Sequence, residues 1–260
     1  MGYSKVKKKV IEFTYHIASY VHARFFCNIC GRRVFKFIPY ANQNNSISMH
    51  VDLLMSGSDT KNFKCPSCGS IDRERHLLLY IESLGLFNNR KICSVLHFAP
   101  EKHFSKFIES LNPDKYIKCD YNPKSPDIVK MDITNMQFDG NQFDLVIANH
   151  VLEHVFDFRK ALKEIFRVTK KGGICILQTP HTRLLKNSID DPGINNDQLR
   201  MFFYGETDHR ALFSEGYLIE SLEKVGFEVT VYENNINSNR YADFECGVNP
   251  NETFFLIKKP

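Results

Sequence analysis

The feature that most constrains the fold is an alternation of short apolar runs with amphipathic stretches, which begins near Lys91. Such an alternation is typical of a parallel sheet whose strands are joined by crossover helices. The clearest helix is expected over Leu152–Val168, because its apolar residues recur on one helical face. The seven candidate strands are Ile92–Phe98, Tyr116–Tyr121, Ile128–Met131, Phe143–Asn149, Ile174–Thr179, Phe227–Tyr232 and Thr253–Ile257. We therefore expect an α/β fold from Lys91 onward.

Glycine and serine positions indicate where the later elements begin and end. Gly172 and Gly173 are expected to break the chain between the long helix and the strand that follows it. A last helix is expected over Ser214–Val225, with Ser214 as its N-cap and Gly226 as its C-terminal stop.

Composition limits the class of protein. The chain has 260 residues, of which 43% are hydrophobic and 25% charged, and its formal net charge is +4. That excess does not indicate a nucleic-acid partner, for which a clustered basic face is typical. No apolar run reaches the ~18 residues of a membrane-spanning helix, and no signal-peptide pattern is present, so we expect a cytoplasmic protein. The basic run Lys5–Lys9 is interpreted as the solvated start of a helix, with a patch for an anionic surface as the alternative.

Four of the eight cysteines form two Cys-x-x-Cys pairs, Cys27 with Cys30 and Cys65 with Cys68. Two intervening residues allow both thiolates of a pair to reach one ion at about 2.3 Å, so two pairs complete a tetrahedral four-cysteine zinc site. The glycine after each pair suits the tight turn that such a site needs. A redox dithiol fits less well because a thioredoxin-type motif occurs once, and a catalytic zinc would need an open position.

The cysteine pairs define a small N-terminal module. Between them lie a strand-like run over Val34–Ile38, a polar turn over Asn42–Ser46 and an apolar patch near Val51–Met55. We expect an N-terminal helix and a zinc-ribbon-like module at residues 1–84, and a second domain at residues 85–260. The metal either folds a segment too small to hold itself together, or shapes a module that caps the site of the second domain or docks its substrate.

In an open parallel sheet the ligand lies at the carboxyl ends of the strands, so the residues after each strand are the candidate site. Asp120 lies roughly 20 positions after the first loop. In nucleotide-binding folds a carboxylate at about this spacing accepts hydrogen bonds from ribose hydroxyls. Asp132 is placed to accept a hydrogen bond from an adenine amino group. For Asp120 and Asp132 alike, the alternative is an acidic residue in a surface loop without a binding role. The candidate residues are, strand by strand, His97, Ala99, Pro100 and Glu101, then Asp120, then Asp132, then Asn149 and His150.

The run Phe143–Val155, FDLVIANHVLEHV, resembles the fourth-strand motif of class I S-adenosylmethionine-dependent methyltransferases. The stretch Ala161–Val168 and the turn Lys171–Gly173 resemble the helix and turn that follow it in the same family. The resemblance extends from about Lys91 to the C-terminus. It implies a Rossmann-like seven-stranded sheet, S-adenosylmethionine as cofactor, and transfer of its methyl group to an acceptor.

The whole chain further resembles a bacterial subgroup of this family that has an N-terminal four-cysteine zinc module. The shared marks are CPSCGS before Arg73, VLHFAPE at Val95–Glu101, and the triplet Asp208-His209-Arg210. Such proteins resemble those found with enzymes of surface-polysaccharide biosynthesis. The resemblance implies a small-molecule or sugar acceptor, a precursor or decoration of such a polysaccharide, methylated on oxygen or nitrogen.

The first loop departs from the family pattern, in which an acidic residue precedes G-x-G-x-G. His97, Ala99 and Glu101 occupy the corresponding positions. Ala99 is small enough to allow part of the close backbone approach that glycine gives, whereas Glu101 is not. We expect Glu101 to contact the cationic amino group of the cofactor, with loss of cofactor binding as the alternative. His154, within the fourth-strand motif, is expected to pack near the cofactor.

A hydroxyl acceptor calls for a general base, and imidazole suits this role near neutral pH. His150, directly after the fourth strand, is the first candidate. His209 is the second, with Asp208 able to orient its ring and Arg210 able to hold an anionic group of the substrate. His181, after the fifth strand, is the third. For each histidine, a structural role is the alternative.

Two other functions are open alternatives. A zinc module fused to a class I domain also occurs in RNA methyltransferases, but the fourth-strand motif lacks the Asn/Asp-Pro-Pro-Tyr form of nucleobase methylation. Interleaved basic and aromatic runs are also absent from the sequence. A non-catalytic adaptor that retained the fold is favoured by the altered first loop and opposed by the histidines at the strand ends.

Overall fold

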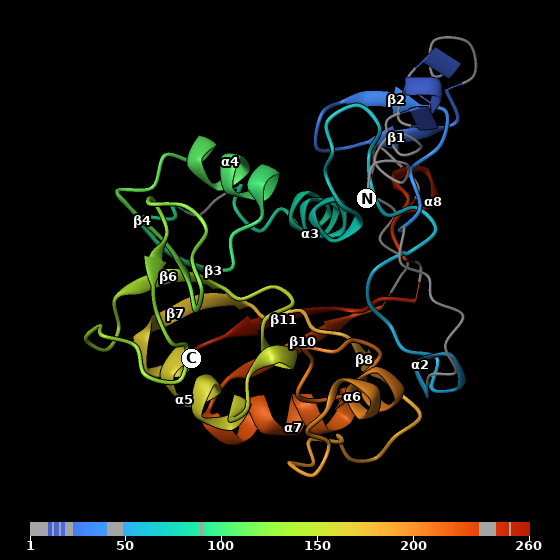
Figure 1. The fold of residues 1–260 in the computed structure, drawn as a ribbon. Helices are drawn as coiled ribbons and strands as arrows, with labels where there is room; N and C mark the ends of the chain where they lie inside the picture. Colours follow the sequence, from blue (N-terminus) through green and yellow to red (C-terminus); the bar gives the residue numbers. More distant parts are fainter. Residues whose placement is uncertain are drawn as a thin grey trace.

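A central sheet organises the chain in the computed structural model, which describes residues 10–11, 13–15, 17–18, 23–40, 49–88, 91–233, 243–249 and 251–260 (Figure 1). The strand order is β10-β11-β7-β6-β3-β4-β5. Strands β3 to β7 pair in parallel, whereas β11 lies antiparallel between β7 and β10. The strands are β3 (Ser94–Phe98), β4 (Lys115–Asp120), β5 (Val129–Lys130), β6 (Phe143–Ile147), β7 (Thr169–Ile176), β10 (Glu228–Tyr232) and β11 (Phe254–Lys258). The predicted α/β fold with a seven-stranded sheet is confirmed.

Helices cover both faces of this sheet, and each face has its own apolar core (Figure 1). Successive residues of a strand point to opposite faces, so Leu145 and Ile147 of β6 belong to one core and Val146 to the other. Helices α3 and α4 contribute to the first core, and α5 and α7 to the second. Their bounds are α3 (Asp72–Ser83), α4 (Lys102–Ser110), α5 (Phe158–Val168) and α7 (Glu215–Val225).

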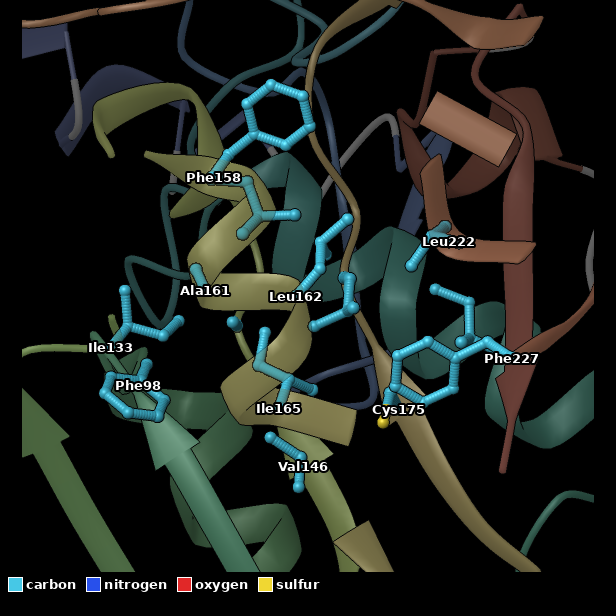
Figure 2. Close-up of a cluster of buried hydrophobic side chains, with 14 of the residues drawn as sticks. Phe98, Ile133, Val146, Phe158, Ala161, Leu162, Ile165, Cys175, Leu222 and Phe227 are labelled. Atoms are coloured by element: carbon cyan, nitrogen blue, oxygen red, sulfur yellow. The ribbon is translucent and has the colours of Figure 1, made fainter. Parts of the chain in front are cut away.

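Helix α5 presents a single apolar stripe to the sheet. Phe158, Ala161, Leu162 and Ile165 are fully buried on this stripe, and Figure 2 shows Ile165 beside Val146. The spacing of these residues is that of one helical face, so burial of the stripe holds the helix against β6 and β7. This packing fixes the loop between β6 and α5, which carries His150 and His154.

The single helix predicted over Leu152–Val168 is wrong at its start. A short 3-10 turn, η1 (Leu152–His154), comes first, and α5 begins only at Phe158. The Asp157 side chain accepts a hydrogen bond from the Lys160 backbone N at 3.0 Å, so it caps a new helix. The interruption between η1 and α5 changes the direction of the chain after His154, and α5 then packs against the sheet.

The predicted break at Gly172 and Gly173 is also wrong, because both residues lie inside β7. The register between β6 and β7 shifts at this point. Gly172 has φ +71°, and its backbone N donates to Lys259 O at 2.7 Å. A Cβ on Gly173 would lie 2.5 Å from Thr169 Cγ2. The two glycines therefore form a bulge within the strand rather than a stop before it.

The predicted boundaries of the last helix are confirmed. The Ser214 Oγ accepts a hydrogen bond from the Tyr217 backbone N at 3.5 Å, which is the N-cap arrangement. Gly226 ends α7 with φ +112°, a conformation that side-chain-bearing residues rarely adopt.

The N-terminal module contains an antiparallel pair, β1 (Phe25–Cys27) and β2 (Arg32–Val34). The strand predicted over Val34–Ile38 is wrong, because β2 ends at Val34 and Ile38 forms an isolated bridge with Lys64. This bridge brings the chain back to the second cysteine pair. The predicted segments Lys5–Lys9 and Asn42–Ser46 lie outside the described residues.

Short elements complete the described fold: α2 (Met49–Asp52), β8 (His181–Thr182), α6 (Asp197–Tyr204), β9 (Phe213–Ser214) and α8 (Asp243–Cys246). Helix α8 packs against β1, so the C-terminal region contacts the N-terminal module. None of the helices in the described part of the chain has the length and apolar character needed to cross a membrane.

Helix α3 connects the module to the sheet. Its residues Leu77, Tyr80 and Ile81 are buried in the core that includes Val95 and Phe254. The Tyr80 and Phe254 rings stack with centroids 4.7 Å apart. The domain boundary between residues 84 and 85 stays a prediction.

Candidate functional site

The first loop leaves β3 with an unusual backbone. Ala99 has φ +46°, and its backbone N donates to Cys119 O at 2.8 Å, which holds the loop beside β4. Ala99 is exposed and Pro100 half-buried, and Glu101 then occupies the N-cap position of α4. The loop thus follows a left-handed turn of the kind that glycine usually makes, although the residue is alanine.

A chain of hydrogen bonds joins the ends of β3 and β6. Asn149 Nδ2 donates to Glu101 Oε1 at 2.7 Å, and His97 Nε2 lies 3.2 Å from Glu101 Oε2. His97 Nδ1 lies 2.8 Å from the Tyr116 hydroxyl. Burial alone would raise the pKa of Glu101, but the hydrogen bond from His97 and the charges of His97 and Arg73 outweigh it and lower that pKa. Both Glu101 oxygens are therefore engaged from within the protein.

Asp120 and Asp132 lie at the carboxyl ends of β4 and β5, as predicted. Asp120 Oδ1 accepts from the Asn122 backbone N at 2.7 Å. Asp132 Oδ1 accepts from the backbone N and the hydroxyl of Thr134, both at 2.8 Å. Each carboxylate is thus held in a turn at the same edge of the sheet as the first loop.

A cavity of about 710 Å³ lies beside the carboxyl ends of β6 and β7. His150 and Pro180 line it from the sheet, and Tyr40, Phe63 and Arg73 line it from the N-terminal region. The loop after α6 closes a further side. Two segments that are distant in sequence, the region around the cysteine pairs and the sheet edge, therefore share one cavity.

His150 is held in place within this cavity by its backbone and by Glu153. Its φ is +52°, and its backbone N donates to Gln178 O at 2.7 Å. His150 Nδ1 lies 3.3 Å from Glu153 Oε1, while Glu153 Oε2 accepts from the Thr179 hydroxyl at 2.8 Å. Burial alone would raise the pKa of Glu153, but the hydrogen bond from His150 and the nearby histidine charges lower it to about 2. Glu153 is thus a carboxylate that fixes the imidazole of His150.

A second buried carboxyl group faces the other nitrogen of His150. Glu252 Oε1 lies 3.9 Å from His150 Nε2 and 3.5 Å from His76 Nδ1. Burial raises the pKa of Glu252 well above its ordinary value and lowers the pKa of His76 to about 3. His150 therefore has the Glu153 carboxylate on one side and the buried carboxyl group of Glu252 on the other.

Of the other predicted residues, His154, His209 and Asp208 line the cavity, whereas Arg210 and His181 lie outside its lining. The guanidinium of Arg210 lies over the Phe156 ring. His181 is buried, with Nδ1 at 3.0 Å from Thr179 O and Nε2 at 2.9 Å from Thr253 Oγ1 and 3.2 Å from Glu215 Oε2. These contacts hold His181 between the segment after β7, the segment before β11 and helix α7, outside the lining of the cavity.

Sequence reasoning missed several residues that the structure brings to the site. Glu153 and Arg73 lie inside the motifs quoted above but had no role assigned to them. Their charges, at positions next to the predicted site, were the signal that could have pointed to them. Glu252 and His76 carried no signal, because they meet His150 only through contacts distant in sequence.

The four cysteines of the two pairs converge in the N-terminal module. One sulfur from each of Cys27, Cys30, Cys65 and Cys68 lies within 4.8 Å of the others, and Cys27 Sγ is 3.8 Å from Cys68 Sγ. Tetrahedral bonds of about 2.3 Å to zinc imply a similar sulfur–sulfur spacing.

The turns around these cysteines also suit a metal site. The backbone N of Ser67 donates to Cys65 Sγ, and the backbone N of Ser70 to Cys68 Sγ, each at 3.4 Å. Gly31 and Gly69 have φ of +68° and +83°, which confirms the predicted turn after each pair. Amide donors stabilise thiolates, so these residues fit a Zn²⁺ ion.

Comparison with known proteins finds similarity for part of the chain. Residues 91–177 match the model of a family described as a methyltransferase domain. A demethylmenaquinone methyltransferase from Clavibacter sepedonicus is 37% identical over 67 residues, which cover 25% of this chain and 27% of that protein. The match therefore spans about a quarter of the curated relative's length.

Two solved structures are similar at low identity. An S-adenosylmethionine-dependent methyltransferase from Mesorhizobium loti is 11% identical with a TM-score of 0.48, covering 72% of this chain and 98% of that one. One from Archaeoglobus fulgidus is 14% identical with a TM-score of 0.47, covering 71% and 94%. The matched family segment runs from Lys91 to Leu177 and contains β3 to β7 with their carboxyl-end residues. The similarity to the methyltransferase domain family therefore covers residues 91–177.

Proposed function

We propose that the protein is an S-adenosylmethionine-dependent methyltransferase that acts on a small, hydroxyl-bearing acceptor such as a sugar. One observation carries the proposal: a segment of the methyltransferase domain family places His150 in a cavity at the carboxyl edge of its sheet. A cavity of about 710 Å³ falls within the range of small-molecule sites.

The residues at the strand ends suit the cofactor. Asp120 would accept from its ribose hydroxyls and Asp132 from its adenine amino group. Ala99 provides the left-handed turn that lets the backbone approach closely. Asn149 Oδ1 is buried without a hydrogen-bond partner among the described residues, and with Glu101 it offers acceptors to the cationic amino group. When bound, the cofactor supplies a methyl group on a sulfonium sulfur.

The lining of the cavity favours an uncharged polyhydroxylated acceptor. Tyr40 and Phe63 offer aromatic faces, and Glu153, Glu206 and Asp208 offer acceptors for hydroxyl groups. The same three acids would repel the phosphates of an RNA. The four-cysteine module holds the aromatic wall in place, so in this proposal it caps the acceptor site. A precursor of a surface polysaccharide is the substrate class that these features and the subgroup resemblance support.

In the proposed reaction His150 accepts the proton of the acceptor hydroxyl as the oxygen attacks the methyl group. Glu153 orients the imidazole and stabilises its charged form. The rigid loop between β6 and α5 holds His150 in one position, which supplies the orientation that methyl transfer requires. His209 is the second candidate for this role.

The proposal is tested with zinc-loaded protein in two assays. Calorimetry with S-adenosylmethionine measures cofactor binding, with Asp120→Ala as the variant that should lose it. Transfer of labelled methyl groups to uncharged oligosaccharides and to bulk RNA measures the reaction. His150→Asn suits the second assay, because asparagine tolerates the left-handed backbone of this position.

We expect His150→Asn to bind the cofactor within about twofold of the wild type and to transfer methyl groups at least about 100-fold more slowly. His103→Gln, a histidine on α4 that contacts Glu74 outside the cavity lining, is the control and should retain activity. Absence of cofactor binding by folded protein would reject the enzyme. Methylation of RNA alone would reject the acceptor class.

A further inference from the structure

A histidine and carboxylate cluster lies within the cavity, separate from the cysteine site. One ligand atom from each of Glu153, His154 and His209 lies within 4.8 Å of the other two. Glu153 and His154 come from η1, and His209 comes from the loop after α6, so the cluster joins two elements. All three residues line the cavity.

A hydrogen bond at Nδ1 orients the imidazole ring of His154 and that of His209. His209 Nδ1 lies 3.2 Å from Tyr204 O, and a carbonyl oxygen can only accept, so Nδ1 carries the proton. His154 Nδ1 lies 3.4 Å from Asp208 O, which makes Nδ1 the donor there as well. In the neutral form of each ring, Nε2 is therefore the nitrogen with the free lone pair. A metal-binding histidine typically has this arrangement, with its second nitrogen bound to a carbonyl or carboxylate.

The carboxylate of Glu153 is fixed in the same way. Thr179 donates to its Oε2 at 2.8 Å, and His150 Nδ1 lies 3.3 Å from its Oε1. A carboxylate has about four acceptor positions, so these two contacts leave room for a cation. Glu153 is buried, and its side chain is therefore already held in one orientation.

The charge of the cavity also favours a cation. Glu206 and Asp208 line it together with Glu153, and Arg73 is the one Lys or Arg side chain among the described residues of the lining. His154 Nδ1 lies 3.5 Å from Asp208 Oδ2, so a further carboxylate borders the cluster. A divalent cation would offset this local excess of negative charge.

We infer that Glu153, His154 and His209 bind a first-row divalent metal ion, such as Zn²⁺ or Co²⁺, at the wall of the cavity. Two imidazoles and one carboxylate are a ligand set for these ions, and three protein ligands leave positions open toward the cavity. The binding site itself does not depend on methyl transfer. Its role rests on the proposed function: the ion would bind oxygen atoms of the acceptor and hold the reacting hydroxyl beside His150.

Cobalt titration of the protein loaded with one equivalent of zinc tests the site. The zinc occupies the four cysteines, because thiolates bind Zn²⁺ more tightly than imidazole and carboxylate ligands do, and Co²⁺ binds the cysteines too weakly to displace it. Cobalt on nitrogen and oxygen ligands absorbs weakly in the visible range, whereas cobalt on cysteine adds an intense thiolate charge-transfer band. We expect the wild type to bind one equivalent of Co²⁺ without that band.

The variants His154→Gln, His209→Gln and Glu153→Gln should each weaken cobalt binding at least about tenfold. His154 is exposed, so His154→Gln tests the site even if a buried variant fails to fold. His103→Gln again serves as the control and should bind like the wild type. Absence of a cobalt equivalent in the wild type, or binding unchanged in folded His154→Gln, would overturn the inference. Cofactor calorimetry is independent of this readout, so failure of one proposal is distinguishable from failure of the other.

Discussion

At the scale of single residues, Ala99 carries backbone strain at the first loop. Its φ of +46° lies in the left-handed region, which costs an L-residue roughly 1–2 kcal/mol relative to glycine. Glycine would remove this strain but add conformational entropy to the unfolded chain, about 0.4–1 kcal/mol. We therefore expect Ala99→Gly to raise the free energy of unfolding by about 0.5 kcal/mol in urea denaturation.

Ala161→Gly is the matched control for that prediction, because Ala161 is fully buried within α5. The free energy of unfolding of Ala161→Gly should fall by at least about 1 kcal/mol, because glycine is a poor helix former and leaves a gap in the core. Equal losses in the two variants would show that the Ala99 backbone is not strained.

Residue positions at the site were predictable where they follow directly from a strand end. Asp120, Asn149 and His150 lie at the sheet edge as expected, because a parallel sheet brings its carboxyl ends together. His181 also follows its strand, yet β11 and α7 cover it. Glu252 could not be found, because its contact with His150 depends on how β11 enters the sheet. The residues at a strand end can be read from the sequence around that strand, whereas the residues that pack around a strand end come from distant parts of the sequence.

At the scale of elements, the bulge in β7 gives a sharp test. A Cβ on Gly173 would lie 2.5 Å from Thr169 Cγ2 and 2.7 Å from Lys170 O, closer than atoms pack. We expect Gly173→Ala to reduce the free energy of unfolding by about 2 kcal/mol or more, because the strand must shift to admit the methyl group. Gly216 in α7 has nothing within 4 Å of an added Cβ. Gly216→Ala should instead raise the free energy of unfolding by about 0.5–1 kcal/mol, and a loss in both variants would contradict the bulge.

The elements themselves were predictable to the extent that local chemistry decides them. All seven strands and the caps of α7 were expected from apolar runs, Ser214 and Gly226. The errors arose where pairing between strands overrides the local signal. Gly172 and Gly173 indicate a break when read alone, but hydrogen bonding to the C-terminal strand keeps them inside β7. Asp157 starts a second helix where the apolar pattern suggested one continuous helix.

At the scale of the whole molecule, Arg75 ties the cysteine module to the C-terminal region. It is fully buried on α3, and its Nε donates to Cys246 O at 2.7 Å and its Nη2 to Gly247 O at 3.0 Å. Its Nη1 donates to Ser70 O at 3.1 Å, beside the second cysteine pair. The same helix packs on the sheet. The metal site, the C-terminal region and the sheet therefore depend on one buried guanidinium.

Removal of zinc should consequently destabilise more than the module. Loss of the metal frees the chain around Ser70 and leaves a buried, charged donor of Arg75 without one of its acceptors, which costs about 3 kcal/mol. We expect chelator-treated protein to unfold at a temperature lower by about 6 °C or more in calorimetry. The chain has no tryptophan, so tyrosine circular dichroism reports on the tertiary packing. Cys68→Ser should reproduce the chelated state, whereas Cys93→Ser, outside the cluster, should respond to chelator like the wild type. An unchanged transition after verified zinc loss would mean that the module folds independently of the sheet and that Arg75 does not couple them.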